Sequence, residues 1–285
     1  MSYDASANGN RPCVRLWVVA VAVTLLWSSV AAAGEVKLSG FVGAEGRAFV
    51  HDPQFRSQFE GVQPSLIVNP ELSYDTEDGR HQFSLVPFLR LDARDEERTH
   101  VDVREAYWRY VGDDWEVLIG LDTVFWGVTE SRHLVNVINQ IDQVEDIDEE
   151  DFLGQPMVNL AVQRDWGRLD LFALPGFRER PFPGKDGRLR TALPVDDDAA
   201  EFESELEQLH VDAAVRYSHF IGDWDIGAYY FYGTGREPRL VPSADGTRLE
   251  PRYDLINQVG LDIQYTSDAW LWKFEGIVRE GQGDT

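Results

Sequence analysis

From Gly34 onward, polar and apolar residues alternate with a period of two almost everywhere. In "EVKLSGFVGAEGRAFV", for example, Val36, Leu38 and Val42 fall on one face and Lys37 and Glu45 on the other. Strict alternation is typical of β-strands that have one apolar and one polar face. The pattern predicts eleven strands, at about residues 35–50, 64–75, 80–91, 100–111, 115–121, 157–164, 168–174, 208–220, 224–232, 253–266 and 269–279.

One predicted strand changes face. In "HVDVREAYWRYV" the apolar set runs through Val101 and Val103, and then continues at Ala106, Trp108 and Tyr110. One extra residue in a strand produces such a change, so we expect a β-bulge near positions 104–105.

The connections between these strands alternate between short and long. The short ones are "TEDG", "GDD", "DW", "GD" and "SD", and the long ones include residues 122–156 and 175–207. Short turns at one end and long loops at the other are typical of an antiparallel up-and-down transmembrane β-barrel of the outer membrane, with periplasmic turns and extracellular loops. The mean hydropathy of -0.33 is compatible with this fold class, because alternating strands produce no hydropathy peak.

Four tryptophans lie beside the short turns. Trp115, Trp166, Trp224 and Trp270 would therefore meet at one end of a barrel, where an aromatic girdle contacts the membrane–water interface. The alternative is that they are core residues of a soluble β-sandwich.

The N-terminus has the pattern of a secretory signal peptide over residues 1–33. Arg11 and Arg15 precede the apolar run "LWVVAVAVTLLW", and "SSVAAA" offers a cleavage site before Gly34. The alternative is an uncleaved anchor helix, although the apolar run is shorter than the roughly 20 residues that span a bilayer. The only cysteine, Cys13, would be removed with the signal peptide.

The stretch "REAYWRYVGDDWEVLIGLDTVFWGVTESRHLVNVINQIDQVED" resembles Gram-negative outer-membrane porins, and more closely a family of uncharacterised porin-like barrels. The resemblance implies that residues 34–285 form a barrel in the outer membrane, in contact with lipid and lipopolysaccharide, and it leaves a homo-oligomer open. Bacterial barrels normally have an even number of strands. Because the count here is odd and the chain ends at "REGQGDT", we expect a sequence truncated at its C-terminus.

Loop 122–156 follows the fifth predicted strand, as does the third loop of general porins, which folds inward and narrows the pore. Leu134, Ile138, Ile141 and Val144 share one helical face, and Thr129 or Ser131 would cap the helix. Carboxylates at a constriction would favour cations. The alternatives are a hydrated surface loop and a calcium site, although the Gly and the distal Glu of an EF-hand are missing. The acidic residues concerned are Glu145, Asp146, Asp148, Glu149, Glu150 and Asp151.

The polar strand faces should line the lumen with charges of both signs. Such a wall suits hydrophilic solutes, and some of its charges would form cross-strand ion pairs. The residues assigned to the lumen are Arg47, Glu71, Arg90, Arg104, Glu116, Arg168, Asp212, Arg216, Asp262 and Lys273.

The sequence offers little for catalysis. The six histidines are scattered, and Ser131 and His133 have no identifiable acid partner. We therefore expect no enzyme, no metal and no cofactor, and the net charge of -24 argues against binding nucleic acid. The predicted function is a channel for passive diffusion of small hydrophilic solutes, with a preference for cations. The alternative is a non-conducting barrel that acts in surface binding or cell-envelope adhesion.

Overall fold

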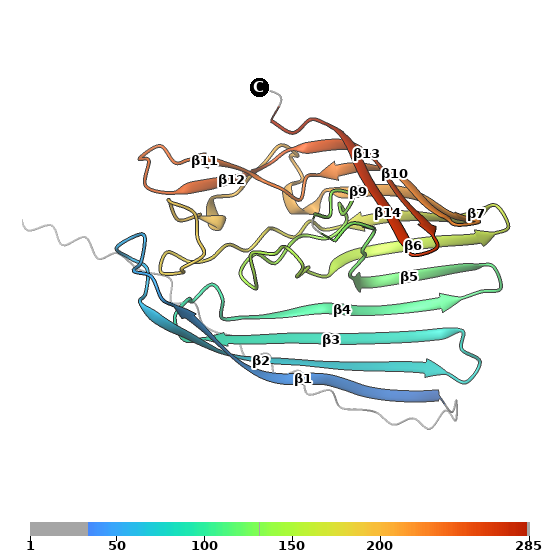
Figure 1. Cartoon of the computed structure of the whole chain (residues 1–285), viewed down its shortest axis with the longest axis horizontal. Coiled ribbons are helices and arrows are strands. Elements are labelled where there is room, and N and C mark those ends of the chain that lie inside the picture. The colour runs from blue at the N-terminus through green and yellow to red at the C-terminus, as the bar shows by residue number, and fades with distance from the viewer. Residues whose placement is uncertain (1–33, 131, 284–285) are drawn as a thin grey trace, which may run out of the picture. The chain divides into compact units, whose positions relative to one another are not determined.

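The alternating segments form one antiparallel sheet of eleven strands, here called the main sheet (Figure 1). The computed structural model describes residues 34–130 and 132–283, so the expected signal peptide and Ser131 lie outside the described residues. Each predicted segment matches one strand to within three residues. The strands are β1 (Gly34–Phe49), β2 (Gly61–Thr76), β3 (His81–Asp92), β4 (His100–Val111), β5 (Trp115–Asp122), β6 (Gln155–Arg164), β7 (Gly167–Pro175), β9 (Val211–Ile221), β10 (Trp224–Thr234), β13 (Leu255–Ser267) and β14 (Trp270–Glu280).

Strand order in the main sheet follows chain order, so the up-and-down arrangement is confirmed. Turns of two to four residues follow β2, β4, β6, β9 and β13, and they lie together at one end of the strands in Figure 1. The connections at the other end are longer, and the longest are 123–154 and 176–210. The predicted alternation of short and long connections is therefore also confirmed. Within the described ranges no helix is long and apolar enough to cross a membrane.

A second, smaller sheet lies in the long loops. It contains β8 (Glu201–Phe202), β11 (Arg239–Pro242) and β12 (Leu249–Tyr253), and the short 3-10 helices η1 (Asp197–Ala199) and η2 (Glu207–Leu209) flank β8. The rings of Phe177, Phe202 and Tyr253 pack together at centroid distances of 4.8 to 5.7 Å and join the loops that carry this sheet. These three strands are not among the eleven predicted from the sequence.

The predicted β-bulge is confirmed in β4. Val86 pairs with Glu105 and Pro87 pairs with Val103, so Arg104 is the extra residue. Proline has no backbone N–H to donate to a neighbouring strand, and bulges are among the places where sheets accommodate it.

The predicted helix in loop 122–156 is wrong, because the described residues between β5 and β6 contain none. Asn139 instead binds the backbone of the loop: its side chain accepts from the N–H of Val124 and donates to the carbonyls of Asp122 and Leu153. Asn side chains that bind backbone groups in this way compete with helix formation. Thr129, one of the two predicted caps, instead donates its hydroxyl to the carbonyl of Arg132, and the other, Ser131, lies outside the described residues.

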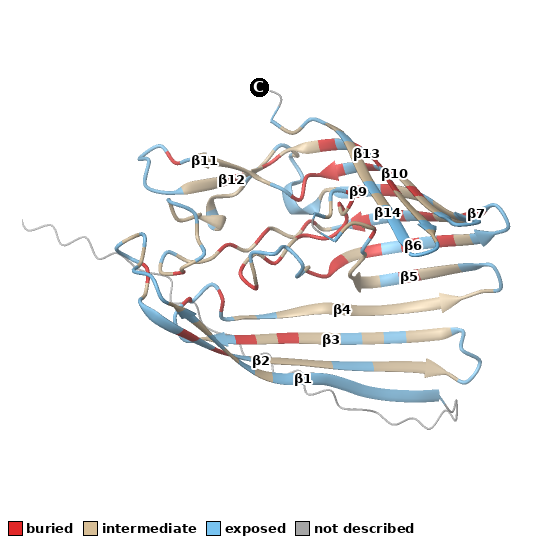
Figure 2. Cartoon of the chain, viewed as in Figure 1, coloured by how far each residue is buried: buried red, intermediate tan, exposed pale blue. Residues whose placement is uncertain are grey.

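The two faces of the main sheet differ in an unusual way. One face, here called the apolar face, exposes large hydrophobic side chains: Leu38 is 76 %, Leu171 43 % and Val278 70 % exposed. The opposite, polar face carries the charged residues of the strands, and loop 123–154 covers part of it. Figure 2 shows buried residues in this loop and in the strands beneath it, whereas most of β1 is exposed.

The hydrophobic core lies between the polar face and the loop. Trp126, Val135 and Ile138 of the loop pack against Phe172 of β7 and Phe231 of β10. The core is therefore small and lies on the side of the sheet that also carries the charges, while most apolar strand residues point away from it.

The conformation of Gly40 generates a stability prediction. Gly40 has φ +108°, and a Cβ there would lie 2.2 Å from the carbonyl oxygen of Asn69 on β2. We expect Gly40→Ala to lower the free energy of unfolding by ~1–3 kcal/mol, because strain of this kind has that cost. Urea unfolding followed by tryptophan fluorescence measures it.

Gly46→Ala is the matched control, because Gly46 lies on the same strand with no neighbouring atom within 4 Å of the added Cβ. Equal stability of the two variants would contradict the proposed strain.

Candidate functional site

Loop 123–154 contacts strands at both edges of the main sheet. At one edge, Asp146 forms an ion pair of 3.0 Å with Arg47 of β1. At the other, the carboxylate of Glu275 on β14 accepts hydrogen bonds from the backbone N–H groups of Val128 and Thr129 at 2.7 and 2.9 Å. The main sheet therefore curls around the loop. Within the described residues the ladder has β1 and β14 at its two ends, with no pairing between them.

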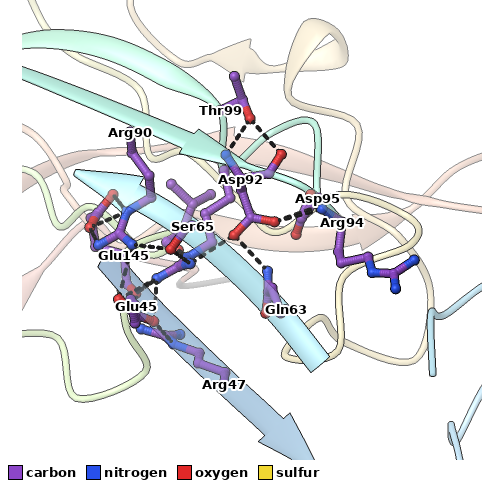
Figure 3. Close-up of polar contacts among 12 residues, drawn as sticks. Glu45, Arg47, Gln63, Ser65, Arg90, Asp92, Arg94, Asp95, Thr99 and Glu145 are labelled. Atoms are coloured by element: carbon purple, nitrogen blue, oxygen red, sulfur yellow. Dashed lines mark hydrogen bonds and ion pairs between the residues drawn. The ribbon is translucent and has the colours of Figure 1, made fainter. Parts of the chain in front are cut away.

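A buried ion pair between Arg90 and Glu145 is the centre of this contact (Figure 3). The guanidinium Nε of Arg90 lies 2.7 and 2.8 Å from the two carboxylate oxygens, and both side chains are at most 5 % exposed. Arg90 also donates to Glu45 at 3.0 Å and to the hydroxyl of Ser65 at 2.9 Å. Arg90 lies on β3, and its partners Glu45 and Ser65 lie on β1 and β2. Because these three strands hold Arg90 in place, its ion pair with Glu145 holds the loop in one position.

Two further arginines bind the backbone of the same segment. Arg98 donates to the carbonyls of Val144 and Glu145 at 2.8 and 3.1 Å, and Arg47 donates to the carbonyl of Glu145 at 2.7 Å. Arg98 is held in turn by Asp92 at 2.9 Å. These arginines satisfy carbonyl groups that a helix would have satisfied internally.

Asp142 is a further anchor that the sequence analysis missed. Its side chain is fully buried, binds the guanidinium of Arg104 and lies 3.4 Å from Nε2 of His100. Burial opposes ionisation of this carboxyl, but its contacts with His100 and with the guanidinium of Arg104 outweigh burial and lower the pKa below the usual range. Asp142 is the single charged residue among residues 134–144, and this was the available signal.

The predicted constriction residues do not form one uniform group. Glu145 is buried and Asp146 is partly buried, and each binds an arginine, as described above. Asp148, Glu149, Glu150 and Asp151 are exposed. Glu150 lies 2.8 Å from the imidazole of His133. The acidic run therefore divides into an anchoring part and an exposed part, and its effect on ions stays a prediction.

Open space surrounds the exposed part. Cavities of about 490, 480 and 600 Å³ adjoin the loop, and Glu150 lines all three. Asp151 lines the first of these cavities, while Asp148 and Glu149 line the last. The exposed carboxylates are thus placed where a solute in these cavities would meet them.

The ten residues predicted to line a lumen all lie on the polar face of the main sheet or at its bulge. Each of the ten has a polar partner: Arg216 binds Asp262 through two hydrogen bonds of 2.7 and 2.8 Å, and Arg168 binds Asp170 and Glu116. The others bind as follows: Arg47 to Glu45, Glu71 to Ser39, Arg90 to Glu145, Arg104 to Asp142, Asp212 to Arg236 and Lys273 to Glu130. The ion pairs Arg216–Asp262 and Arg168–Glu116 join different strands, as predicted for some of these charges, whereas most of the others join a strand to a loop. A lumen stays a prediction.

The four tryptophans lie at the end of the strands that carries the short turns. Trp115, Trp166, Trp224 and Trp270 are 42, 49, 45 and 70 % exposed, so none of them is a core residue. Trp224 stacks on Tyr265 of the neighbouring strand at 4.4 Å. The arrangement matches what a girdle requires, and contact with lipid stays a prediction.

A metal ion fits poorly at the site. Within the described part of the chain, His100, Asp142 and Glu145 bring three ligand atoms to within 4.8 Å of one another. Both carboxylates are already bound by arginines, Arg104 and Arg90, whose positive charges would repel a cation. We assign no metal to this cluster.

Comparison of the chain with family models, curated proteins and solved structures finds no match.

The ion pair at the centre of the site generates the second prediction. Glu145→Gln removes the negative charge opposite Arg90 and should destabilise the anchored loop by roughly 3 kcal/mol, because breaking a buried pair leaves the partner uncompensated. Limited proteolysis measures this as faster cleavage within residues 123–154.

Glu149→Gln is the control, since it removes the same charge from an exposed position of the same loop. Equal cleavage of the two variants would show that the ion pair does not anchor the loop.

Proposed function

We propose that the protein is an outer-membrane channel for passive diffusion of small hydrophilic solutes, with a preference for cations. The observation that supports this proposal best is the difference in polarity between the two faces of the main sheet. The apolar face is exposed, and the polar face carries charged residues beneath a loop. A water-soluble sheet places its apolar side chains in the core, whereas a transmembrane barrel places them against lipid.

In this proposal the sheet belongs to a barrel wall whose polar face lines the lumen. The short turns are periplasmic, the exposed tryptophans contact the interface, and the long loops are extracellular. Loop 123–154 crosses the lumen and narrows it. Its exposed carboxylates, Asp148 to Asp151, set the preference for cations because fixed negative charge at a narrow point attracts them.

A non-conducting barrel is the second candidate, and one observation favours it. Loop 123–154 is anchored at both edges of the sheet by buried or partly buried polar contacts, so it could fill the lumen as a plug. Its long loops would then act in surface binding or cell-envelope adhesion. Single-channel recording in planar bilayers separates the two candidates, because conductance steps support the channel and their absence with folded protein supports the plug.

The placement in a membrane generates the third prediction. Leu171 lies in the middle of β7 on the apolar face. We expect Leu171→Arg to lower the stability of the protein in lipid vesicles by ~2–4 kcal/mol, because it places a charge near the bilayer midplane. Urea titration of the vesicle-inserted protein measures it.

Leu206→Arg is the control, because Leu206 is even more exposed, at 59 %, but lies in a long loop. It should change stability by no more than about 0.5 kcal/mol, as ordinary surface substitutions do. An equally small effect at Leu171 would argue against the membrane placement.

The cation preference generates the fourth prediction. The double variant Glu150→Gln/Asp151→Asn removes two carboxylates that line the 490 Å³ cavity. We expect the ratio of potassium to chloride permeability, measured from reversal potentials in a KCl gradient, to fall toward one.

The matched control is Glu205→Gln/Glu207→Gln, which removes two exposed charges from another long loop. Selectivity should stay at the wild-type value in the control. An unchanged reversal potential in the Glu150/Asp151 variant would overturn the role of loop 123–154 in selectivity.

A further inference from the structure

The long loops bury an arginine that has no acidic partner. Arg180, in the connection 176–210, is 8 % exposed. Its guanidinium donates to the side-chain oxygen of Gln140 at 3.1 Å and to the backbone carbonyl of Arg236 at 3.2 Å. Both acceptors are uncharged, and no ion pair of Arg180 occurs in the described ranges. The other buried arginines of the polar face and the loops, such as Arg90, Arg98 and Arg236, each bind a carboxylate.

An isolated buried charge is costly, and arginine does not escape the cost by losing its proton. Burial lowers the pKa of Arg180, and only more distant acids such as Glu149 and Glu237 oppose the effect. The neutral hydrogen bonds replace part of the lost hydration but do not neutralise the charge. A bound anion would do so.

A second arginine offers a free donor at the same place. Arg236 is 6 % exposed, and its Nε and Nη1 are used by the carbonyl of Ile138 and the carboxylate of Asp212. Its Nη2 is buried without a hydrogen-bond partner. Arg180 and Arg236 line the same cavity of about 600 Å³. Guanidinium N–H groups bind the oxygens of a planar carboxylate through strong charge-assisted hydrogen bonds, so these two arginines offer donors for one such group.

The rim of this cavity carries carboxylates, next to the exposed Arg132 and to Arg279, which lies 3.5 Å from Glu237. Glu149 and Glu237 line it, both are exposed, and both act on the pKa of Arg180. Carboxylates at the rim repel a ligand that carries two negative charges and attract an ammonium group. A ligand with one carboxylate and one amine satisfies both parts of the cavity.

We propose that this cavity binds small zwitterionic carboxylates, that is, amino acids, with the carboxylate on Arg180 and Arg236 and the ammonium group toward Glu149. Because binding is measured on the full chain folded in detergent, the result does not depend on whether the protein conducts.

The test uses three probes of similar size in equilibrium dialysis: L-alanine, propionate and ethylamine. L-alanine should bind saturably. Propionate should bind about tenfold more weakly because it lacks the amine, which corresponds to the loss of one charge-assisted hydrogen bond. Ethylamine should not bind. No binding of L-alanine to the wild-type protein, or equal binding of propionate, overturns the proposal.

Two variants locate the site. Arg180→Met should abolish L-alanine binding, and Arg56→Met, which changes an exposed arginine in the loop between β1 and β2, should leave it unchanged. Retained binding in Arg180→Met overturns the proposal. If Arg180→Met does not fold, the Glu149→Gln variant tests the site instead, because this exposed position tolerates the change. It should weaken L-alanine binding to the level of propionate, and an unchanged preference for L-alanine overturns the assignment.

Discussion

The contact between a charged loop and the polar face of the main sheet is the constraint on which the rest of the structure depends. Arg90, Arg98, Asp142 and Glu145 are all removed from water, and each would be strongly unfavourable alone. They are tolerated because the partners come from different strands and meet in fixed geometry: Glu45 from β1, Ser65 from β2, Arg90 from β3. The sheet must curl to bring these strands and β14 to one loop, so its curvature and the position of the loop are determined together.

This polar interior explains why the exterior is apolar. The residues of a strand alternate between faces, so a strand that points Arg216 or Asp262 toward the loop must point its neighbours, such as Tyr217 and Leu261, away from it. Ion pairs and loop side chains occupy much of the space beside the polar face, next to the cavities, and the core consists of few residues around Trp126, Ile138 and Phe231. Such a small core is weak support for a sheet of eleven strands in water. An apolar surrounding removes this difficulty, because the exposed apolar face then contributes to stability.

The features that the sequence predicts well are those that depend on near neighbours in the chain. Alternation specifies each strand, and a change of phase at Arg104 specifies the bulge, because both are read within a few residues. The conformation of loop 123–154 depends instead on distant partners. Asp142 and Arg104 are 38 positions apart, and Glu145 and Arg90 are 55 apart. Helical spacing of Leu134, Ile138, Ile141 and Val144 was a genuine local pattern, but these ion pairs and the side chain of Asn139 override it. The parallel pairing of two-residue β8 with β12 likewise has no local signal.

The same dependence on distant partners changes how the acidic run should be understood. In the sequence, the acidic residues between positions 145 and 151 look equivalent, and repulsion between their charges alone would keep the segment mobile. In the structure Glu145 is neutralised and anchors the segment, and Asn139 and Asp142 fix the chain before it. The remaining carboxylates are therefore carried on a backbone that is held close to the polar face. Charges in fixed positions attract an ion without any further ordering of the loop. The entropic cost of ordering the loop is therefore part of the cost of folding and does not oppose the attraction of the ion. In the proposed channel, the anchoring residues thus determine how effectively the exposed carboxylates act on ions.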